Sequence, residues 1–334
     1  MSHRHINPRT ILEVFLILFV STLIFVPLLG MKWIPFSDIL QFTNTPEGRI
    51  VWMIRVPRVL LGLFAGASLS LAGMSFQAMF RNPLATPFTL GVSSGAALGT
   101  AIYIKIGLQW NVLGLSGLIF AAFIGAGISI LIVYGLSKSF KDFSTYTMLL
   151  AGVAVNFFFS SLILFLQYLS DFTQLHRIIH WLMGGLEITG YQDVINMGIF
   201  FLIGSVIILL NRRELNLLVT GEEIALSRGV NVERTKTLLF ITASLMVGAV
   251  VAFCGPIGFV GMMVPHICRL LIGFDHTYLA PASLLLGGVF LVLCDTFART
   301  IIAPAEIPVG VITALLGGPF FVWLLISGKK GFKI

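Results

Sequence analysis

Long apolar stretches, almost free of Lys, Arg, Asp and Glu, make up most of the chain. Because an α-helix needs about 20 apolar residues to cross a bilayer, each stretch predicts a membrane span. The stretches cover approximately residues 11–31, 59–80, 82–104, 106–137, 143–170, 194–211, 237–268, 277–294 and 307–328. The pattern therefore predicts an all-α, polytopic membrane protein in which residues 1–334 form a single transmembrane domain.

One stretch decides the number of spans. Residues 237–268 are too many for one upright helix, and Gly255-Pro256 lies in their middle, where a helix would break. Nine or ten spans are therefore possible. With ten, both termini lie on one side of the membrane, together with most of the Lys and Arg residues. The positive-inside rule favours about ten spans, with the tails 1–10 and 329–334 and the loop 211–236 in the cytoplasm.

Composition excludes other classes of protein. Hydrophobic residues make up 57% and charged residues 10% of the chain, whereas soluble proteins are about 45–50% apolar and about 25% charged. The net charge of +7, from 21 Lys and Arg and 14 Asp and Glu, is too thinly spread to bind nucleic acid. The three cysteines fall in apolar stretches without a C-x-x-C pair, so they are expected to be packing residues.

Four arginines break the charge bias. Arg49, Arg55 and Arg58 precede the second span and Arg299 ends the ninth, on the side that holds few basic residues. Such a cluster could dock an acidic partner or attract an anionic ligand. The alternative is that these side chains anchor the helices at the membrane interface.

The cytoplasmic loop 211–236 contains a candidate helix bounded by glycines. Glu222 and Glu223 lie at its start and Arg228 at its end, which suits the helix dipole. The segment between Gly221 and Gly229 could face a partner protein, or it could be a solvated connection.

Candidate catalytic and metal-binding residues are few. Residues 91–95 match the pattern G-x-S-x-G, but they begin an apolar helix instead of following a strand, which argues against a serine hydrolase. His176 and His180 are four residues apart and would share a helix face, as suits contact with a metal or haem, or simply an interfacial helix. No P-loop pattern occurs in the sequence, so the chain is not expected to hydrolyse ATP.

A series of short motifs runs through most of the chain. They are Ile54-Arg55-Val56-Pro57-Arg58, Arg81-Asn82-Pro83-Leu84-Ala85, Leu90-Gly91-Val92-Ser93-Ser94-Gly95, Trp181-Leu182-Met183-Gly184-Gly185, Gly221-Glu222-Glu223-Ile224-Ala225-Leu226, Gly255-Pro256-Ile257-Gly258-Phe259 and Pro304-Ala305-Glu306-Ile307-Pro308. In this order they strongly resemble the FecCD family, the permeases of type II ABC importers for cobalamin, haem and ferric siderophores.

The resemblance implies a BtuC-like bundle and a set of partners. A homodimer with about ten helices per subunit would lie in the inner (cytoplasmic) membrane. Two copies of a cytoplasmic ABC ATPase would bind ATP and Mg, and this chain would bind no cofactor itself. A periplasmic or lipid-anchored binding protein would deliver the cargo by docking on Arg55, Arg58 and Arg299.

The resemblance also implies roles inside the bundle. Contact with the ATPase would involve the loop residues Gly221, Glu222, Glu223, Ala225, Leu226, Arg228 and Gly229. The translocation pathway would include Gly91, Ser93, Asn156, Ser160 and Leu166. The cargo stays open among ferric siderophore, haem and cobalamin, with an iron chelate as the default. His176 and His180 favour haem slightly.

A proton-coupled secondary transporter of a metal chelate is the alternative. It would depend on acidic residues within the membrane, and Asp295 and Glu306 are the candidates.

Overall fold

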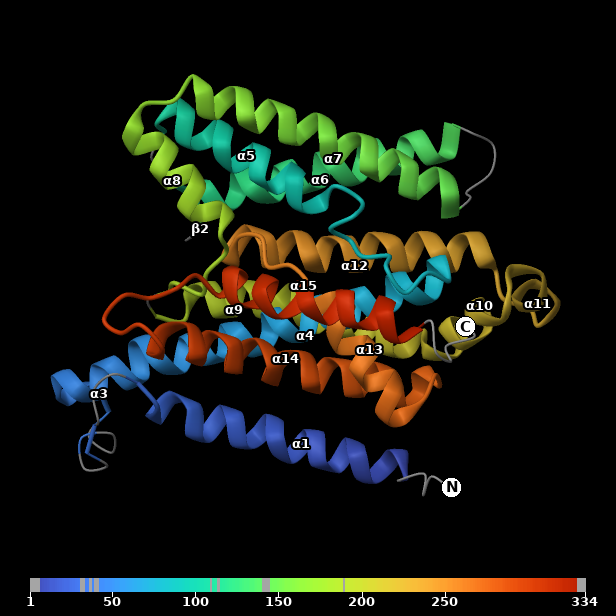
Figure 1. Ribbon diagram of the computed structural model, residues 1–334, viewed down its shortest axis with the longest axis horizontal. Helices are drawn as coiled ribbons and strands as arrows, with labels where there is room; N and C mark the ends of the chain where they lie inside the picture. Colours follow the sequence, from blue (N-terminus) through green and yellow to red (C-terminus); the bar gives the residue numbers. More distant parts are fainter. Residues whose placement is uncertain are drawn as a thin grey trace.

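The computed structural model describes residues 7–30, 34–35, 38, 42–108, 110–112, 115–139, 145–188 and 190–328. The tail 329–334 and most of the tail 1–10 lie outside these residues. The described chain is a bundle of helices that run side by side along one axis (Figure 1). The one strand pairing in this part of the chain is a two-residue hairpin of β1 (Asn111–Val112) and β2 (Leu115–Ser116).

Ten helices account for the predicted spans. Seven are long and apolar enough to cross a membrane, and three shorter apolar helices complete the set within the described residues. In chain order they are α1 (Pro8–Phe25), α4 (Val56–Phe80), α5 (Val92–Ile106), α6 (Gly117–Ser139), α7 (Thr145–Tyr168), α9 (Gln192–Leu210), α12 (Val232–Cys254), α13 (Val260–Ile272), α14 (His276–Thr300) and α15 (Val309–Gly328). The prediction of an all-α bundle with about ten membrane helices is confirmed.

Short helices lie at the two ends of the bundle. They are α3 (Pro46–Ile50), α8 (Phe172–Leu182), α10 (Arg212–Thr220) and α11 (Glu222–Ser227), with 3₁₀ turns at Val26–Leu28 and Phe42–Asn44. One end, here called the α3 end, carries α3, α8 and the loop between α14 and α15 (Figure 1). The opposite α11 end carries α10, α11, the start of α1 and the end of α15, as an even number of crossings requires.

The break predicted at Gly255-Pro256 is present. Helix α12 ends at Cys254, and α13 begins at Val260. Gly255 has a φ of +67°, which favours glycine, and a Cβ at this position would lie 2.6 Å from the carbonyl oxygen of Trp181. A close backbone contact and a left-handed conformation therefore both require glycine where the long apolar stretch divides into two helices.

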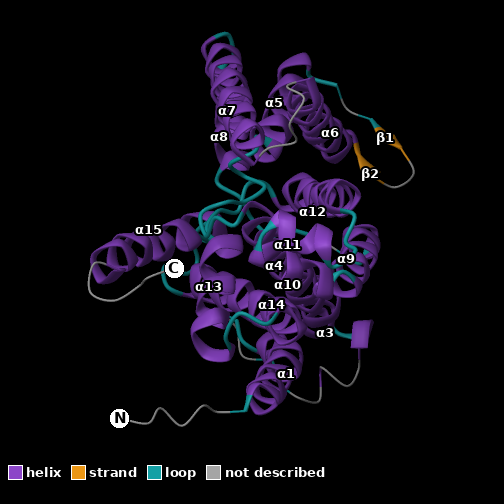
Figure 2. Ribbon diagram, turned by 90° about the vertical axis from the view of Figure 1, so that its right-hand side faces the viewer, coloured by secondary structure: helices purple, strands orange, loops and turns teal. Residues whose placement is uncertain are grey.

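Helix α4 forms the centre of the bundle. Most of its side chains are buried, and it packs against α9, α12, α13 and α14, which surround it in the view along the bundle (Figure 2). At the crossing with α13, a Cβ on Gly73 would lie 1.9 Å from the carbonyl oxygen of Gly261. Such close approach through small residues is how helices pack tightly in lipid, where no hydrophobic effect draws them together.

Candidate transport sites at the two ends of the bundle

Arg55 lies at the α3 end, at the junction of a π-helical turn (Val51–Arg55) with α4. Its side chain is buried, and Nη1 donates to the carbonyl oxygens of Pro27 and Leu28 at 3.4 and 3.3 Å. Any side chain on Gly30 would overlap the guanidinium, because a Cβ there would lie 2.4 Å from Nη2. Arg55 therefore joins the start of α4 to the segment that follows α1.

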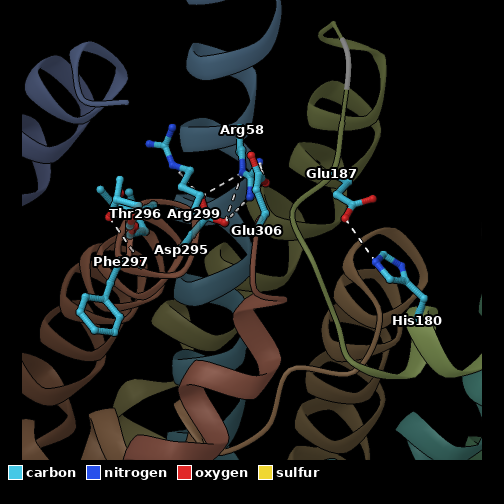
Figure 3. A network of polar contacts seen from close by, with 10 residues as sticks. Arg58, His180, Glu187, Asp295, Thr296, Phe297, Arg299 and Glu306 are labelled. Carbon is cyan, nitrogen blue, oxygen red and sulfur yellow. Dashed lines mark hydrogen bonds and ion pairs between the residues drawn. The ribbon is translucent and has the colours of Figure 1, made fainter. Parts of the chain in front are cut away.

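Arg58, one turn further along α4, forms two ion pairs. Its Nε lies 3.0 Å from Oδ2 of Asp295 and its Nη2 lies 2.9 Å from Oδ1, so the contact is bidentate. Its Nη1 donates to Oε2 of Glu306 at 2.7 Å. Figure 3 shows the guanidinium between the two carboxylates, one from α14 and one from the loop that follows it.

Arg299 belongs to the same cluster. It lies four residues after Asp295 on α14, and its Nε is 3.6 Å from Oδ2 of that carboxylate. Its side chain is only 9% exposed. Together with Arg55, these residues form what we call the arginine cluster: Arg55, Arg58, Arg299, Asp295 and Glu306. Asp295 pairs with Arg58 and Arg299, and Glu306 pairs with Arg58.

The three arginines predicted for docking thus lie at one end of the bundle, as expected. From the sequence, Asp295 and Glu306 are candidates only for carrying protons, whereas in the structure both pair with Arg58 and Asp295 also pairs with Arg299. The spacing of Asp295 and Arg299 on one helix was an available signal, because residues four apart on a helix are neighbours. The contact of Arg58 with Asp295 has no local signal, since 237 residues separate them in sequence.

The segment between Gly221 and Gly229 is helical, as predicted. These glycines have φ values of +131° and +85° and flank α11. Ala225 is fully buried, so it anchors the helix to the bundle and is closed to a partner. The exposed residues of the segment are Glu223, Ile224, Leu226, Ser227, Arg228 and Gly229.

Polar contacts fasten α10 and α11 to the transmembrane helices. Glu222, at the start of α11, forms an ion pair with the buried Lys236 of α12. In α10, Oδ1 of Asn216 accepts from the backbone N–H of His276 at 2.8 Å, and its amide donates to Oδ1 of Asp275 at 2.8 Å. Asn216 therefore links α10 to the first residues of α14. This link has no local signal in the sequence, because 60 residues separate the two positions.

Asp275 is held in its charged form. Burial works to raise the pKa of this carboxyl, but hydrogen bonds from the backbone and side chain of Thr277 and from Asn216 outweigh burial and lower the pKa below its ordinary value. The contact between α10 and α14 thus includes a carboxylate that stays ionised at neutral pH.

The residues expected along the pathway differ in exposure. Helix α7 presents an exposed face that contains Ser160 beside Phe157, with Asn156 and Leu166 partly buried. Ser93 is partly buried, but Gly91 is buried, and its carbonyl accepts hydrogen bonds from Ser94 and Ser129 at 3.0 and 2.7 Å. Gly91 therefore serves the packing of α5 against α6, and no strand precedes it in the described chain.

His176 and His180 lie next to each other on α8, with ring centroids 6.3 Å apart. Both are exposed, and with Arg177 and Trp181 they line an open pocket of about 370 Å³. His180 also lies 3.8 Å from the carboxylate of Glu187. Among the described residues, no group of three or more His, Cys, Asp or Glu side chains could hold a metal ion.

Comparison with known proteins identifies the family. The model of the FecCD transport family matches residues 15–327. The chain is 38% identical over 327 residues to the hemin transport system permease protein HmuU of Yersinia pestis, covering 97% of this chain and 98% of that one. It is 43% identical over 302 residues to the cobalamin import system permease protein BtuC of Halobacterium salinarum, covering 89% of this chain and 80% of that one.

A solved structure supports the same conclusion. A metal-chelate type ABC transporter in an inward-facing conformation superposes with a TM-score of 0.85 at 32% identity, covering 96% of this chain and 99% of that one. PsaBC from Streptococcus pneumoniae shares the fold at a TM-score of 0.58 and 18% identity. From the family match, the relatives and the ten-helix bundle, the chain belongs to the FecCD transport family and is a permease subunit of an ABC importer.

Proposed function

We propose that this permease carries a metal chelate, either an iron chelate such as a ferric siderophore or haem, or cobalamin, across the inner membrane by alternating access. The observation that carries the proposal is the pair of sites at opposite ends of one bundle. A cationic cluster lies at the α3 end, and a short helix with an exposed face lies at the α11 end. An importer driven by ATP needs both, one for the protein that delivers cargo and one for the ATPase.

The proposed assembly is a homodimer of this chain, residues 1–334 forming one transmembrane domain. Two copies of an ABC ATPase in the cytoplasm would bind ATP and Mg and contact α11, whose exposed residues include Leu226 and Arg228. The chain binds no cofactor of its own in this proposal. The α11 end and both termini face the cytoplasm, which agrees with the concentration of basic residues there.

The binding protein, periplasmic or lipid-anchored, docks at the α3 end. Acidic side chains on its surface pair with the guanidinium groups of the arginine cluster. Opposite charges on two such surfaces speed their encounter and fix their orientation.

The pathway lies along the exposed face of α7. Ser160 is a polar residue on the exposed face of an apolar helix, which suits a water-filled path or a partner subunit better than lipid. Ser93 and Leu166 are further candidates for this path, and Gly91 supports it only through packing.

The cargo is proposed from the relatives and from α8. The relatives carry the names of haem and cobalamin permeases, and the solved structure that of a metal-chelate transporter. His176, His180 and Arg177 at the open pocket of α8 suit an anionic metal chelate such as haem.

The test is ATP hydrolysis by the permease purified with its ATPase in lipid, with and without loaded binding protein. Loaded binding protein is expected to stimulate hydrolysis, and Arg58→Gln to remove most of that stimulation while basal hydrolysis remains. Lys138→Glu, a charge reversal at an exposed site on the opposite end, serves as the control. The proposal fails if no ATPase copurifies and transport follows a proton gradient instead.

The proton-coupled alternative is not favoured. Asp295 and Glu306 both pair with Arg58, so in the structure these two acids serve as counterions of one guanidinium. The family relatives are permeases of ABC transporters.

A further inference from the structure

The two carboxylates that contact Arg58 differ in burial and in support. The side chain of Asp295 is 4% exposed, lies within α14 and is flanked by a second arginine, Arg299. The side chain of Glu306 is 40% exposed and belongs to the loop between α14 and α15, where residues 301–306 are all exposed. Asp295 is thus a fixed, buried counterion, whereas Glu306 lies at the surface on a loop.

Only one contact of Arg58 depends on Glu306. Nε and Nη2 face Asp295, and Nη1 faces Glu306 at 2.7 Å. If Glu306 moves away, Asp295 still holds the guanidinium in place through the hydrogen bonds from Nε and Nη2, and Nη1 becomes free to bind another carboxylate. Arginine suits such sharing, because its five N–H donors lie in a rigid fork.

The charges of the cluster also change when Glu306 leaves. In the ion pairs of the cluster, Arg58 and Arg299 are balanced by Asp295 and Glu306, and one positive charge is left uncompensated when Glu306 leaves. Exposed ion pairs contribute little to stability and are screened by salt, whereas a buried pair resists separation. Glu306 is therefore the contact that can open while the rest of the cluster stays intact.

We infer that Glu306 is an internal competitor for the docking site. It occupies the arginine nitrogen that a surface carboxylate of the incoming protein binds, so docking exchanges one carboxylate for another at Nη1 of Arg58. The partner is an acidic protein surface, and the exchange rests on the proposed docking function. Glu306 weakens docking, which helps the binding protein to leave after delivery, and it shields the cluster from other anions.

The test measures the affinity of the loaded binding protein for the permease–ATPase complex in lipid nanodiscs, comparing wild type with Glu306→Gln. The variant is expected to bind roughly 3- to 10-fold more tightly, with a steeper loss of affinity as salt increases, because its docking surface carries more positive charge. Glu306→Ala is expected to increase the affinity in the same way, which would show that the amide introduced by Glu306→Gln is not responsible.

Glu187→Gln is the matched control. Glu187 is also an exposed carboxylate at the α3 end, 68% exposed, but its contact is with His180 instead of an arginine (Figure 3). Glu187→Gln changes the net charge by the same amount as Glu306→Gln, but it frees no nitrogen of Arg58. It is therefore expected to alter the affinity far less than Glu306→Gln does. Equal effects of the two variants would mean that only total charge matters, and would overturn the exchange.

A second variant separates this inference from the docking proposal. In an Arg58→Gln background, Glu306→Gln is expected to have no further effect, because the nitrogen that the two carboxylates share is gone. Unchanged or weaker binding by Glu306→Gln alone overturns the exchange while docking itself stands. Wild-type affinity in Arg58→Gln would show instead that docking on Arg58 is wrong, and the exchange would fail with it.

Discussion

At the scale of single residues, Asp295 holds the α3 end together. It accepts three hydrogen bonds from Arg58 of α4 and lies beside Arg299 on its own helix. All three side chains are at most 12% exposed. Removing one member of a buried pair leaves an uncompensated charge, which costs more than the pair contributes when intact. The stability of the cluster should therefore depend on Asp295 far more than on Glu306.

We predict that Asp295→Asn lowers the free energy of unfolding by about 3–5 kcal/mol, because Arg58 and Arg299 lose their shared buried counterion. Thermal unfolding of the purified protein in detergent measures the change. Glu187→Gln, at an exposed site, is expected to shift the melting temperature little. An unchanged melting temperature in Asp295→Asn would contradict the role of this carboxylate.

The sequence alone predicted some of these residues and not others. Arg55, Arg58 and Arg299 stood out because they violate the charge bias, and α11 because glycines bound it. The counterions did not stand out, because a contact between residues on different helices leaves no local pattern. Gly91 is expected in the pathway only from the family resemblance, and in the structure it is buried, with its carbonyl accepting hydrogen bonds from Ser94 and Ser129.

At the scale of elements, close contacts between helices fix the position of α4. Gly73 meets Gly261 of α13, and Gly66 meets Gly287 of α14, where a Cβ would lie 2.2 Å from a carbonyl oxygen. The sequence shows Gly62 and Gly66 four residues apart, a spacing that permits close packing of helices. It does not identify the partner helices, because a contact between distant spans leaves no local pattern.

We predict that Gly73→Ala destabilises the bundle by about 1–3 kcal/mol or more, since the methyl group would overlap the backbone of α13 and force the helices apart. Melting temperature in detergent is the measurement. Gly127→Ala on α6 is the control, because a Cβ there meets nothing within 4 Å and alanine favours the helix. The packing account fails if the two variants melt alike.

At the scale of the whole molecule, an even number of crossings places α11, the start of α1 and the end of α15 at one end (Figure 1). The break at Gly255-Pro256 and the basic residues were enough to predict this arrangement. The side of the membrane that each end faces is a prediction from the charge bias. The cargo could not be predicted, because the motifs are shared by permeases of several chelates.

Cysteine labelling tests that orientation. The native Cys254, Cys268 and Cys294 are buried and free, so a membrane-impermeant maleimide is expected to leave the wild-type protein unlabelled in intact cells. Arg228→Cys should react only after the cytoplasmic face is opened, and Ala305→Cys should react from outside. The reverse pattern would invert the proposed topology.

Helix α14 joins the two ends of the protein without interruption. Its first residue, His276, contacts Asn216 of α10, and Asp295, roughly 29 Å further along the axis at about 1.5 Å per residue, holds Arg58. Pro281 is the weak point between them, because proline removes a backbone hydrogen bond from the helix. Beyond Pro281 the helix is fixed to α4 at two points, by the contact of Gly287 with Gly66 and by the pairing of Asp295 with Arg58. A displacement at α10 would therefore shift this section of α14 together with α4, and with them the loop that carries Glu306.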